Sequence, residues 1–224
     1  MQRVLIWDIW TRLFHWSLVL CVLFLLLSGK TGTGFYEYHR YAGEAVFALL
    51  LFRICRNFYG SSNNRLSALI THPAKSISHL KELLLHREVA PERGHNPAGG
   101  WAVLLMLFLL SVQAVTGFLI ADEEEFIEGA FYGSIPADWS EELLHVHHAN
   151  SSLIMAIVLV HVLMIVVYRL RGRTNLVSRM ISGKAMWPDG VQVPEVRFKH
   201  WSAGLIIACV ALAVTGLLTG WFGI

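Results

Sequence analysis

Residues 143–168 read LLHVHHANSSLIMAIVLVHVLMIVVY and contain no Asp, Glu, Lys or Arg. A helix of about 20 apolar residues crosses the hydrocarbon core of a bilayer, so this segment is long enough to span a membrane. It also carries His147 and His161, and a polar ring inside a span needs a partner. The segment therefore predicts a transmembrane helix that carries part of a functional site.

Further apolar segments lie on both sides of it. Three more intervals of comparable length lack charged residues, namely 13–29, 94–121 and 200–224. Hydropathy alone leaves a fifth segment, residues 38–58, undecided because Arg40, Glu44 and Arg53 interrupt it. The sequence thus predicts four membrane spans and a possible fifth.

The charges of the connecting loops decide between four and five spans. Residues 53–93 carry seven basic and three acidic side chains, residues 169–199 carry seven and two, and residues 121–144 carry eight acidic and no basic ones. Because Lys and Arg accumulate in cytoplasmic loops, both basic loops are expected inside and the acidic loop outside. Only a helix at about 38–58 makes this arrangement consistent. We therefore expect five helices, a cytoplasmic N-terminus and a periplasmic C-terminus, with Glu44 facing the bundle interior.

Composition excludes several classes of protein. Of the 224 residues, 55% are hydrophobic and 15% charged, and five spans leave no gap large enough for a separate soluble domain. The charge distribution gives no support for nucleic-acid binding. The three cysteines lie far apart without a Cys-x-x-Cys pair, which excludes covalent c-type haem, thiolate zinc and iron–sulfur sites.

His147 and His161 lie on one face of their predicted helix. At about 100° per residue, the 14 residues from His147 to His161 turn the helix by about 40° less than four full turns. They cover about 21 Å along the helix axis. One histidine is then near each membrane surface, as two stacked haems would require from a single helix.

Each iron needs a second imidazole at a matching depth. In the predicted topology His15 begins the first helix at the cytoplasmic side, level with His161, and His39 begins the second at the outer side, level with His147. The matching depths predict two pairs of haem ligands, namely His15 with His161 and His39 with His147. Two imidazoles fill both axial positions of a haem iron, so no substrate can bind to it. Outer-sphere electron transfer is then the reaction that remains for the iron. Zinc fits poorly, because the sites do not converge and have no Cys or carboxylate beside them.

The other polar and small residues have weaker assignments. Arg12 and Arg40 could pair with haem propionates or anchor helix ends at the headgroups. Glycines in the helices would allow close approach of a macrocycle or of a neighbouring backbone; these are Gly29, Gly43, Gly117 and Gly204. Four histidines of the first basic loop are expected to face solvent: His72, His79, His86 and His95. His145 and His148 are expected at the interface.

Four elements in order resemble a known family. They are Arg12-Leu-Phe-His15-Trp16, His39-Arg-Tyr-Ala-Gly43, the run Gly94-His95-Asn-Pro97-Ala-Gly99-Gly100-Trp101, and the pair His147 and His161. Together they resemble the bacterial cytochrome b561 and nickel–iron hydrogenase b-type cytochrome family over roughly residues 3–187. The resemblance implies that His15, His39, His147 and His161 ligate two b-type haems in the pairs given above. It also implies electron exchange with a membrane quinone and a protein partner.

The C-terminal segment departs from the four-helix core. It opens with Arg197-Phe-Lys-His200-Trp201-Ser202, which echoes Arg12-Leu-Phe-His15-Trp16-Ser17 and makes His200 a rival ligand for the inner haem. A peripheral helix with His200 and Trp201 at the interface is the favoured interpretation.

Family membership leaves the redox partner open. The acidic loop repels an anion such as superoxide and attracts a basic protein. We therefore expect a periplasmic electron-transfer protein, such as a cytochrome c, as the partner, although the loop charges also follow from topology alone. The alternatives are a membrane-anchor subunit of a hydrogenase or reductase, a superoxide oxidase, and a transporter with a histidine proton relay. The sequence does not decide between an electron carrier and a quinone-linked oxidoreductase subunit.

The expected architecture is an all-α integral membrane protein with a single membrane domain. Residues 1–187 form a four-helix bundle that binds two b-type haems, and residues 188–224 add a fifth transmembrane helix. The protein is expected as a multi-pass component of the bacterial cytoplasmic membrane, in contact with lipid and quinone.

Overall fold

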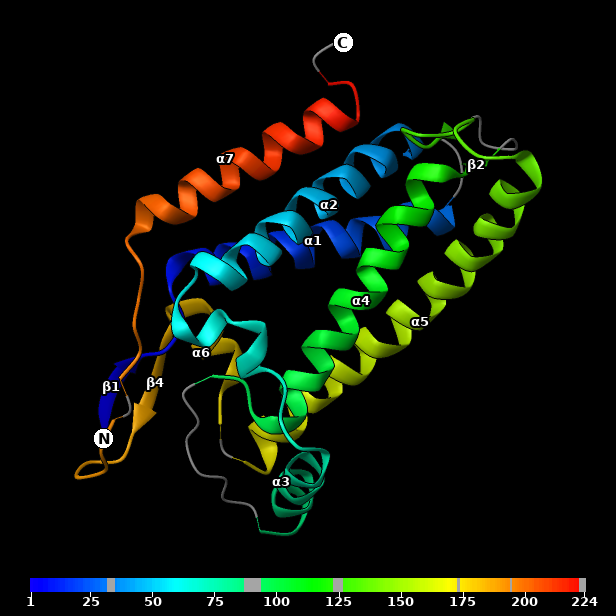
Figure 1. The fold of residues 1–224 in the computed structure, drawn as a ribbon. Helices are drawn as coiled ribbons and strands as arrows, with labels where there is room; N and C mark the ends of the chain where they lie inside the picture. The colour runs from blue at the N-terminus through cyan, green and yellow to red at the C-terminus, as the bar shows by residue number, and fades with distance from the viewer. Residues whose placement is uncertain (32–34, 87–93, 123–126, 173, 194, 222–224) are drawn as a thin grey trace. The chain divides into compact units, whose positions relative to one another are not determined.

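A computed structural model describes residues 1–31, 35–86, 94–122, 127–172, 174–193 and 195–221. The long helices are α1 (Ile9–Thr31), α2 (Tyr36–Tyr59), α4 (Pro97–Leu119), α5 (Ala137–Leu170) and α7 (Trp201–Leu218) (Figure 1). The short helices are α3 (Pro73–His86), α6 (Leu176–Ser182), η1 (Ser62–Asn64) and η2 (Leu66–Ala68). The strands are β1 (Gln2–Leu5), β2 (Ala121–Asp122), β3 (Ile127–Glu128) and β4 (Lys184–Trp187).

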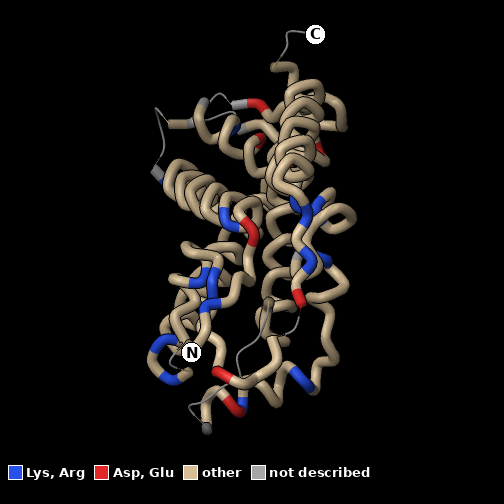
Figure 2. Tube along the Cα trace, turned by 90° about the vertical axis from the view of Figure 1, so that its left-hand side faces the viewer, with Lys and Arg blue, Asp and Glu red and all other residues tan. Residues whose placement is uncertain are grey.

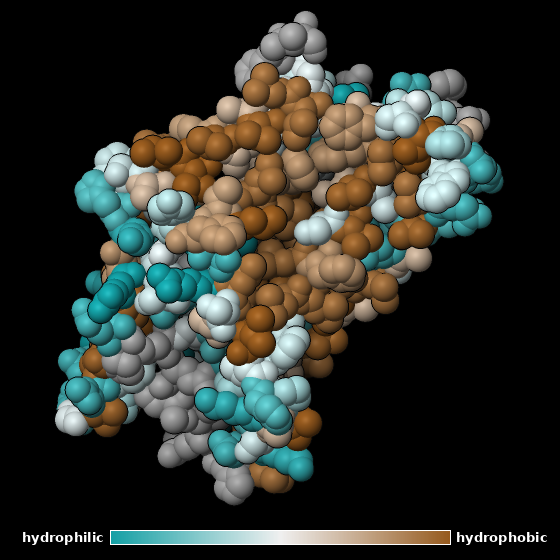
Figure 3. All heavy atoms as spheres, in the orientation of Figure 1, coloured by the Kyte–Doolittle hydropathy of each residue, from teal (hydrophilic) through white to brown (hydrophobic). Residues whose placement is uncertain are grey.

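Four of these helices are long and apolar enough to cross a membrane: α1, α4, α5 and α7, within the part of the chain that is described. Large apolar side chains are exposed along them, including Leu20, Phe108, Leu159 and Ile206. Figure 3 shows such side chains gathered over α4 and α7. Exposed apolar surface of this extent suits lipid as the solvent, so the protein is an all-α, multi-pass membrane protein. The predicted fifth helix is present as α2, and its crossing of the membrane stays a prediction.

Two helices begin earlier than their charge-free intervals. α1 begins at Ile9 rather than at Leu13, because Asp8 accepts a hydrogen bond from the Thr11 N–H at 2.8 Å and caps the helix. His15 therefore lies inside α1 and not at its start, which corrects the predicted position. α5 begins at Ala137 and carries Asp138 in its first turn, where the helix dipole favours a negative charge.

The chain divides into two compact units, and the long helices contribute segments to both. Unit 1 comprises residues 1–14, 55–105 and 158–204, and unit 2 comprises residues 15–54, 106–157 and 205–224.

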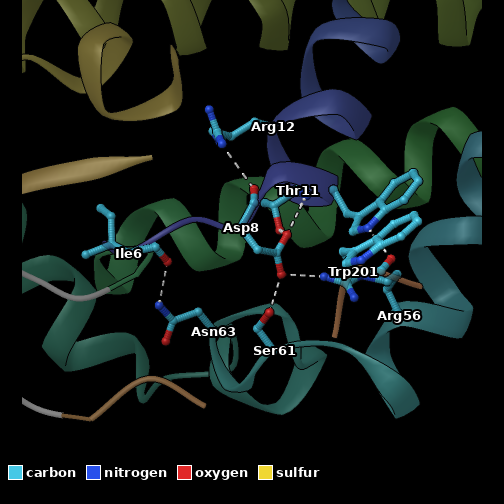
Figure 4. A network of polar contacts seen from close by, with 9 residues as sticks. Ile6, Asp8, Thr11, Arg12, Arg56, Ser61, Asn63 and Trp201 are labelled. Carbon is cyan, nitrogen blue, oxygen red and sulfur yellow. Dashed lines mark hydrogen bonds and ion pairs between the residues drawn. The ribbon is translucent and has the colours of Figure 1, made fainter. Parts of the chain in front are cut away.

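Unit 1 is built around a two-stranded sheet and a polar cluster. β1 pairs antiparallel with β4, Gln2 opposite Trp187, and Ile6, Trp7 and Ala185 form its apolar core. Beside it, the Asp8 carboxylate accepts hydrogen bonds from Thr11, Arg56 and Ser61 (Figure 4). Lys and Arg residues recur along the connecting segments of this unit (Figure 2).

One histidine of helix α3 is buried, although the sequence predicted that it faces solvent. His79 is buried, and its Nε2 lies 2.7 Å from the hydroxyl of Tyr168 on α5. It was expected to face solvent, because α3 was expected to be part of a solvated loop. The helix instead packs one apolar face inward, with Leu83 fully buried beside His79. Of the other loop histidines, His72 is exposed, His95 is half-buried against Trp7, and the His86 side chain lies outside the described part.

Unit 2 holds the buried carboxylate. Glu44 of α2 is fully buried, as the sequence predicted, and accepts hydrogen bonds from Arg40 Nε at 3.0 Å and from the Trp221 indole. Trp221 lies three residues beyond the end of α7, so this bond ties the C-terminal segment to α2. Close by, β2 pairs antiparallel with β3, and Phe47, Phe118 and Phe131 pack edge to face.

Candidate functional site

His39 and His147 open onto one cavity within unit 2. Segments of α1, α2, α4 and α5 line this cavity, together with residues next to the β2–β3 pair. It holds about 1230 Å³ of space between protein atoms, its open mouth included. Both histidines are half-buried, and their α2 and α5 segments belong to the same unit. The structure therefore brings together one of the two histidine pairs predicted from the sequence.

A hydroxyl group on a neighbouring helix holds each of these rings. His39 Nδ1 lies 2.8 Å from Ser28 Oγ on α1, and His147 Nδ1 lies 2.9 Å from Thr116 Oγ1 on α4. Ser28 and Thr116 are both buried. The same ring nitrogen, Nδ1, is bonded in both histidines.

The contacts of the two hydroxyls are compatible with the imidazole tautomer that binds a metal. Thr116 Oγ1 lies 2.9 Å from the carbonyl oxygen of Val112, and Ser28 Oγ lies 3.3 Å from that of Leu25. A carbonyl oxygen can only accept, so each hydroxyl can donate its hydrogen along its own helix and accept at a lone pair from the imidazole. That arrangement requires the imidazole hydrogen on Nδ1. It is the tautomer in which Nε2 can bind a metal.

Two glycines give the rings their space. A Cβ on Gly29 would lie 3.3 Å from His39 Cε1, and a Cβ on Gly117 would lie 3.1 Å from His147 Cε1. Gly43 also lines the cavity, and a Cβ there would meet nothing within 4 Å. Any side chain at Gly43 would therefore occupy space that a flat macrocycle needs. Two imidazoles, a largely helical wall and open space beside a glycine fit a haem.

One cationic side chain next to this cavity is held by an ion pair. Arg40 follows His39 in α2 and lines the cavity, and its guanidinium pairs with buried Glu44 one turn further on. A guanidinium at the wall of a haem cavity is suited to a propionate carboxylate.

The second predicted pair lies in different units. His15 belongs to unit 2 and is half-buried, with its ring edge-on to Trp16 at 5.3 Å between centroids. His161 belongs to unit 1 and is half-buried on α5, the same continuous helix that carries His147. The pairing of His15 with His161 stays a prediction.

The remaining histidines have other surroundings. His145 and His148 are exposed on α5. His200 is exposed just before α7, and its Nδ1 lies 2.8 Å from Ser202 Oγ. Within the described ranges, no three His, Cys, Asp or Glu side chains gather into a group that could hold a metal ion.

The sequence interpretation did not identify Ser28 and Thr116, whose hydroxyls lie beside His39 and His147. Each directly precedes a glycine inside a predicted span, in Ser28-Gly29 and Thr116-Gly117. That local signal is also found at Thr215-Gly216, so the dipeptide alone could not have identified which hydroxyls meet a histidine.

Comparison with known proteins gives one family and two relatives. The family model described as prokaryotic cytochrome b561 matches residues 6–183. A probable Ni/Fe-hydrogenase B-type cytochrome subunit of Rhizobium leguminosarum bv. viciae is 26% identical over 219 residues, which cover 84% of this chain and 91% of the relative. A protein of the same description from Cupriavidus necator is 26% identical over 214 residues, covering 80% of this chain and 85% of the relative.

Proposed function

The chain belongs to the prokaryotic cytochrome b561 family, and on that premise we propose that it carries electrons across the membrane through two b-type haems, each held by two histidines. Members of this family are membrane cytochromes b, so haem b binding and electron transfer are properties of the chain. The proposal concerns three further points: the number of haems, the residues that ligate them, and the redox partners of the protein.

The cavity of unit 2 supports the outer haem site. His39 and His147 both line it, and their Nδ1 atoms are bonded to Ser28 and Thr116. Bound between two imidazoles, a haem supplies a one-electron couple whose iron is closed to substrates. The protein holds the rings, excludes water with apolar helix faces and places Arg40 for a propionate. This single cavity, which both histidines line, is the observation on which the proposal rests.

The inner haem site is proposed from helix geometry. α5 is continuous from Ala137 to Leu170, so His147 and His161 keep the spacing of about 21 Å expected for one helix face. His15 on α1 is the proposed second ligand of the inner haem. His200 is the less favoured candidate, because it lies outside the family match and is exposed.

The relatives favour a catalytic oxidoreductase subunit as the redox partner. Both are described as B-type cytochrome subunits of a Ni/Fe hydrogenase, and each matches this chain over most of its length. We propose that this protein likewise exchanges electrons between membrane quinone and a catalytic subunit of hydrogenase or reductase type. Copurification of such a subunit from native membranes would support this assignment.

A basic cytochrome c is a second candidate partner. Acidic side chains are exposed at the start of α5 and next to it: Glu128, Asp138, Glu141 and Glu142. Such a surface attracts a basic protein and repels superoxide. Electron transfer to cytochrome c that weakens steeply with added salt would favour this candidate.

The haem ligands can be tested by alanine substitution. The purified protein should contain two b-type haems in a pyridine haemochrome assay. His39→Ala and His147→Ala should each remove the same haem, because both rings open onto one cavity, and His161→Ala should remove the other. His148→Ala is the matched control, since His148 is adjacent to His147 and exposed. Two haems retained in His147→Ala would overturn the ligand assignment, and no haem in the wild-type protein would overturn the dihaem proposal.

A further inference from the structure

The two histidines of the unit 2 cavity are held by the same local device on two different helices. In each case a hydroxyl oxygen lies within hydrogen-bond distance of Nδ1, and the glycine that follows it lies against the Cε1 atom of the same ring. Ser28 and Gly29 do this for His39, and Thr116 and Gly117 do it for His147. The hydroxyl determines the orientation of the ring, and the glycine lets it approach the helix.

We propose that Ser28 and Thr116 are positioning residues that hold His39 and His147 as iron ligands and lower the midpoint potential of the haem they share. The inference rests on the proposed function, because it requires a haem between these two rings. It adds two residues that act on the iron without touching it.

The direction of the effect follows from hydrogen-bond chemistry. An Nδ1–H group that donates to an oxygen makes the opposite nitrogen of the ring more basic. A more basic ligand stabilises ferric iron over ferrous iron, so the potential falls. When Nε2 binds iron, Nδ1 carries the hydrogen of the ring, and Thr116 Oγ1 can accept it while donating its own hydrogen to the carbonyl oxygen of Val112 or Gln113, at 2.9 and 3.1 Å. Removing either hydroxyl should therefore raise the potential.

Both hydroxyl side chains are buried. Ser28 is 3% exposed and Thr116 is 4% exposed, so water has little access to the Nδ1 atoms through either residue. A purely structural hydroxyl would change stability when removed. A hydroxyl that acts on the ligand must also move the potential and the spectrum of the iron.

The variants separate the hydroxyl from the shape of the side chain. Thr116→Val keeps the branched shape and removes the acceptor, Thr116→Ser keeps the acceptor, and Ser28→Ala removes the second hydroxyl. Thr215→Val is the matched control, because Ala213-Val214-Thr215-Gly216 repeats the tetrapeptide Ala114-Val115-Thr116-Gly117. The Thr215 hydroxyl donates to the Ala211 carbonyl of its own helix at 2.9 Å.

The readout is a potentiometric titration of the purified protein, followed by the low-temperature electron paramagnetic resonance of the ferric form. Haem content is measured first. Thr116→Val and Ser28→Ala should keep two haems and shift the same one of two reduction waves upward, with altered g values. We expect about a fivefold change in the equilibrium constant for reduction, which is about 40 mV for a one-electron couple. Thr116→Ser and Thr215→Val should titrate like the wild type.

Each outcome has a distinct meaning. Unshifted waves in both Thr116→Val and Ser28→Ala, with both haems present, would overturn the proposal, as would an equal shift in Thr215→Val. Loss of one haem from Thr116→Val but not from Thr116→Ser would support it, since the hydroxyl then decides whether His147 can bind iron. A wild-type protein without haem would instead overturn the proposed function. If Thr116→Val and Ser28→Ala shifted two different reduction waves, the proposal that both residues act on one shared haem would be overturned.

Discussion

At the scale of single residues, the cavity of unit 2 depends on what surrounds two histidines rather than on the histidines alone. His147 and His148 are neighbours in the sequence, but only His147 has its Nδ1 on a buried hydroxyl while His148 is exposed. The difference is one of helix face. A step of one residue turns a helix by about 100°, which moves a side chain from the bundle to the surface.

Gly117→Ala tests how closely the His147 ring must approach α4. The added Cβ would lie 3.1 Å from His147 Cε1, so the ring or the helix has to shift by a few tenths of an ångström. Overpacking of this kind costs about 1–3 kcal/mol, and we expect affinity for the outer haem to fall roughly ten- to hundredfold. Titration of the apoprotein with haem measures this affinity. The inner haem is the internal control, and equal weakening of both haems would contradict the prediction.

At the scale of elements, the start of α1 is anchored by one carboxylate. Asp8 caps α1 through Thr11 and also binds Arg56, near the end of α2, and Ser61 beyond it (Figure 4). Burial alone would raise the pKa of Asp8, but the Ser61 hydrogen bond, the Arg56 charge and the Thr11 bonds outweigh it and lower the pKa. The carboxylate is thus held in its charged form.

Asp8→Asn tests this anchor. The substitution leaves the Arg56 guanidinium buried without its counter-charge, so we expect a loss of about 3 kcal/mol. In detergent this corresponds to a fall in Tm of roughly 6–12 °C. Asp189→Asn is the control, because Asp189 pairs with the N-terminal ammonium at an exposed position and such pairs contribute little. Equal Tm values for the two variants would contradict the anchor.

The same group predicts the pH dependence of stability. A carboxyl whose pKa is lowered on folding adds stability that is present above its unfolded pKa and lost as pH falls through the folded value. The contribution of Asp8 should therefore persist down to about pH 4 and disappear below it. Thermal melts of wild type and Asp8→Asn should converge in that range. A difference that stays constant down to pH 2 would contradict this origin.

At the scale of the whole molecule, the loop charges predict which side of the membrane each loop occupies. Residues 121–144 carry only acidic charges, and the loops at 53–93 and 169–199 are mainly basic. Positive charge is retained in the cytoplasm during insertion, which gives the predicted orientation. It requires α2 to cross the membrane despite Arg40, Glu44 and Arg53, and the burial of Glu44 makes that crossing less costly.

Cysteine labelling tests this orientation. In a variant without the native cysteines, Ser134→Cys before α5 should react with a membrane-impermeant maleimide from the periplasmic side. Ser78→Cys on α3 should react only after the cytoplasmic membrane is opened. Both serines are exposed, so accessibility within the fold does not separate them. Labelling of Ser78→Cys in cells with an intact cytoplasmic membrane would contradict the predicted topology.

The sequence by itself indicated the five long helices, the family and the candidate histidines. Hydropathy and charge are summed along a segment, so residues 143–168 indicate a membrane helix without knowledge of any neighbour, and helix periodicity places His147 and His161 on one face. The burial of Glu44 also followed, because a carboxylate in a span has few other places to go.

Only the tertiary structure decided which partners these residues have. Thr116 is 31 residues from His147, and Trp221 is 177 residues from Glu44, so no local pattern links them. His79 was expected in solvent and is buried, because its environment comes from Tyr168 on another helix. Hydrogen bonds depend on positions to within a few tenths of an ångström, and those positions are set by packing between distant segments rather than by the sequence around either residue.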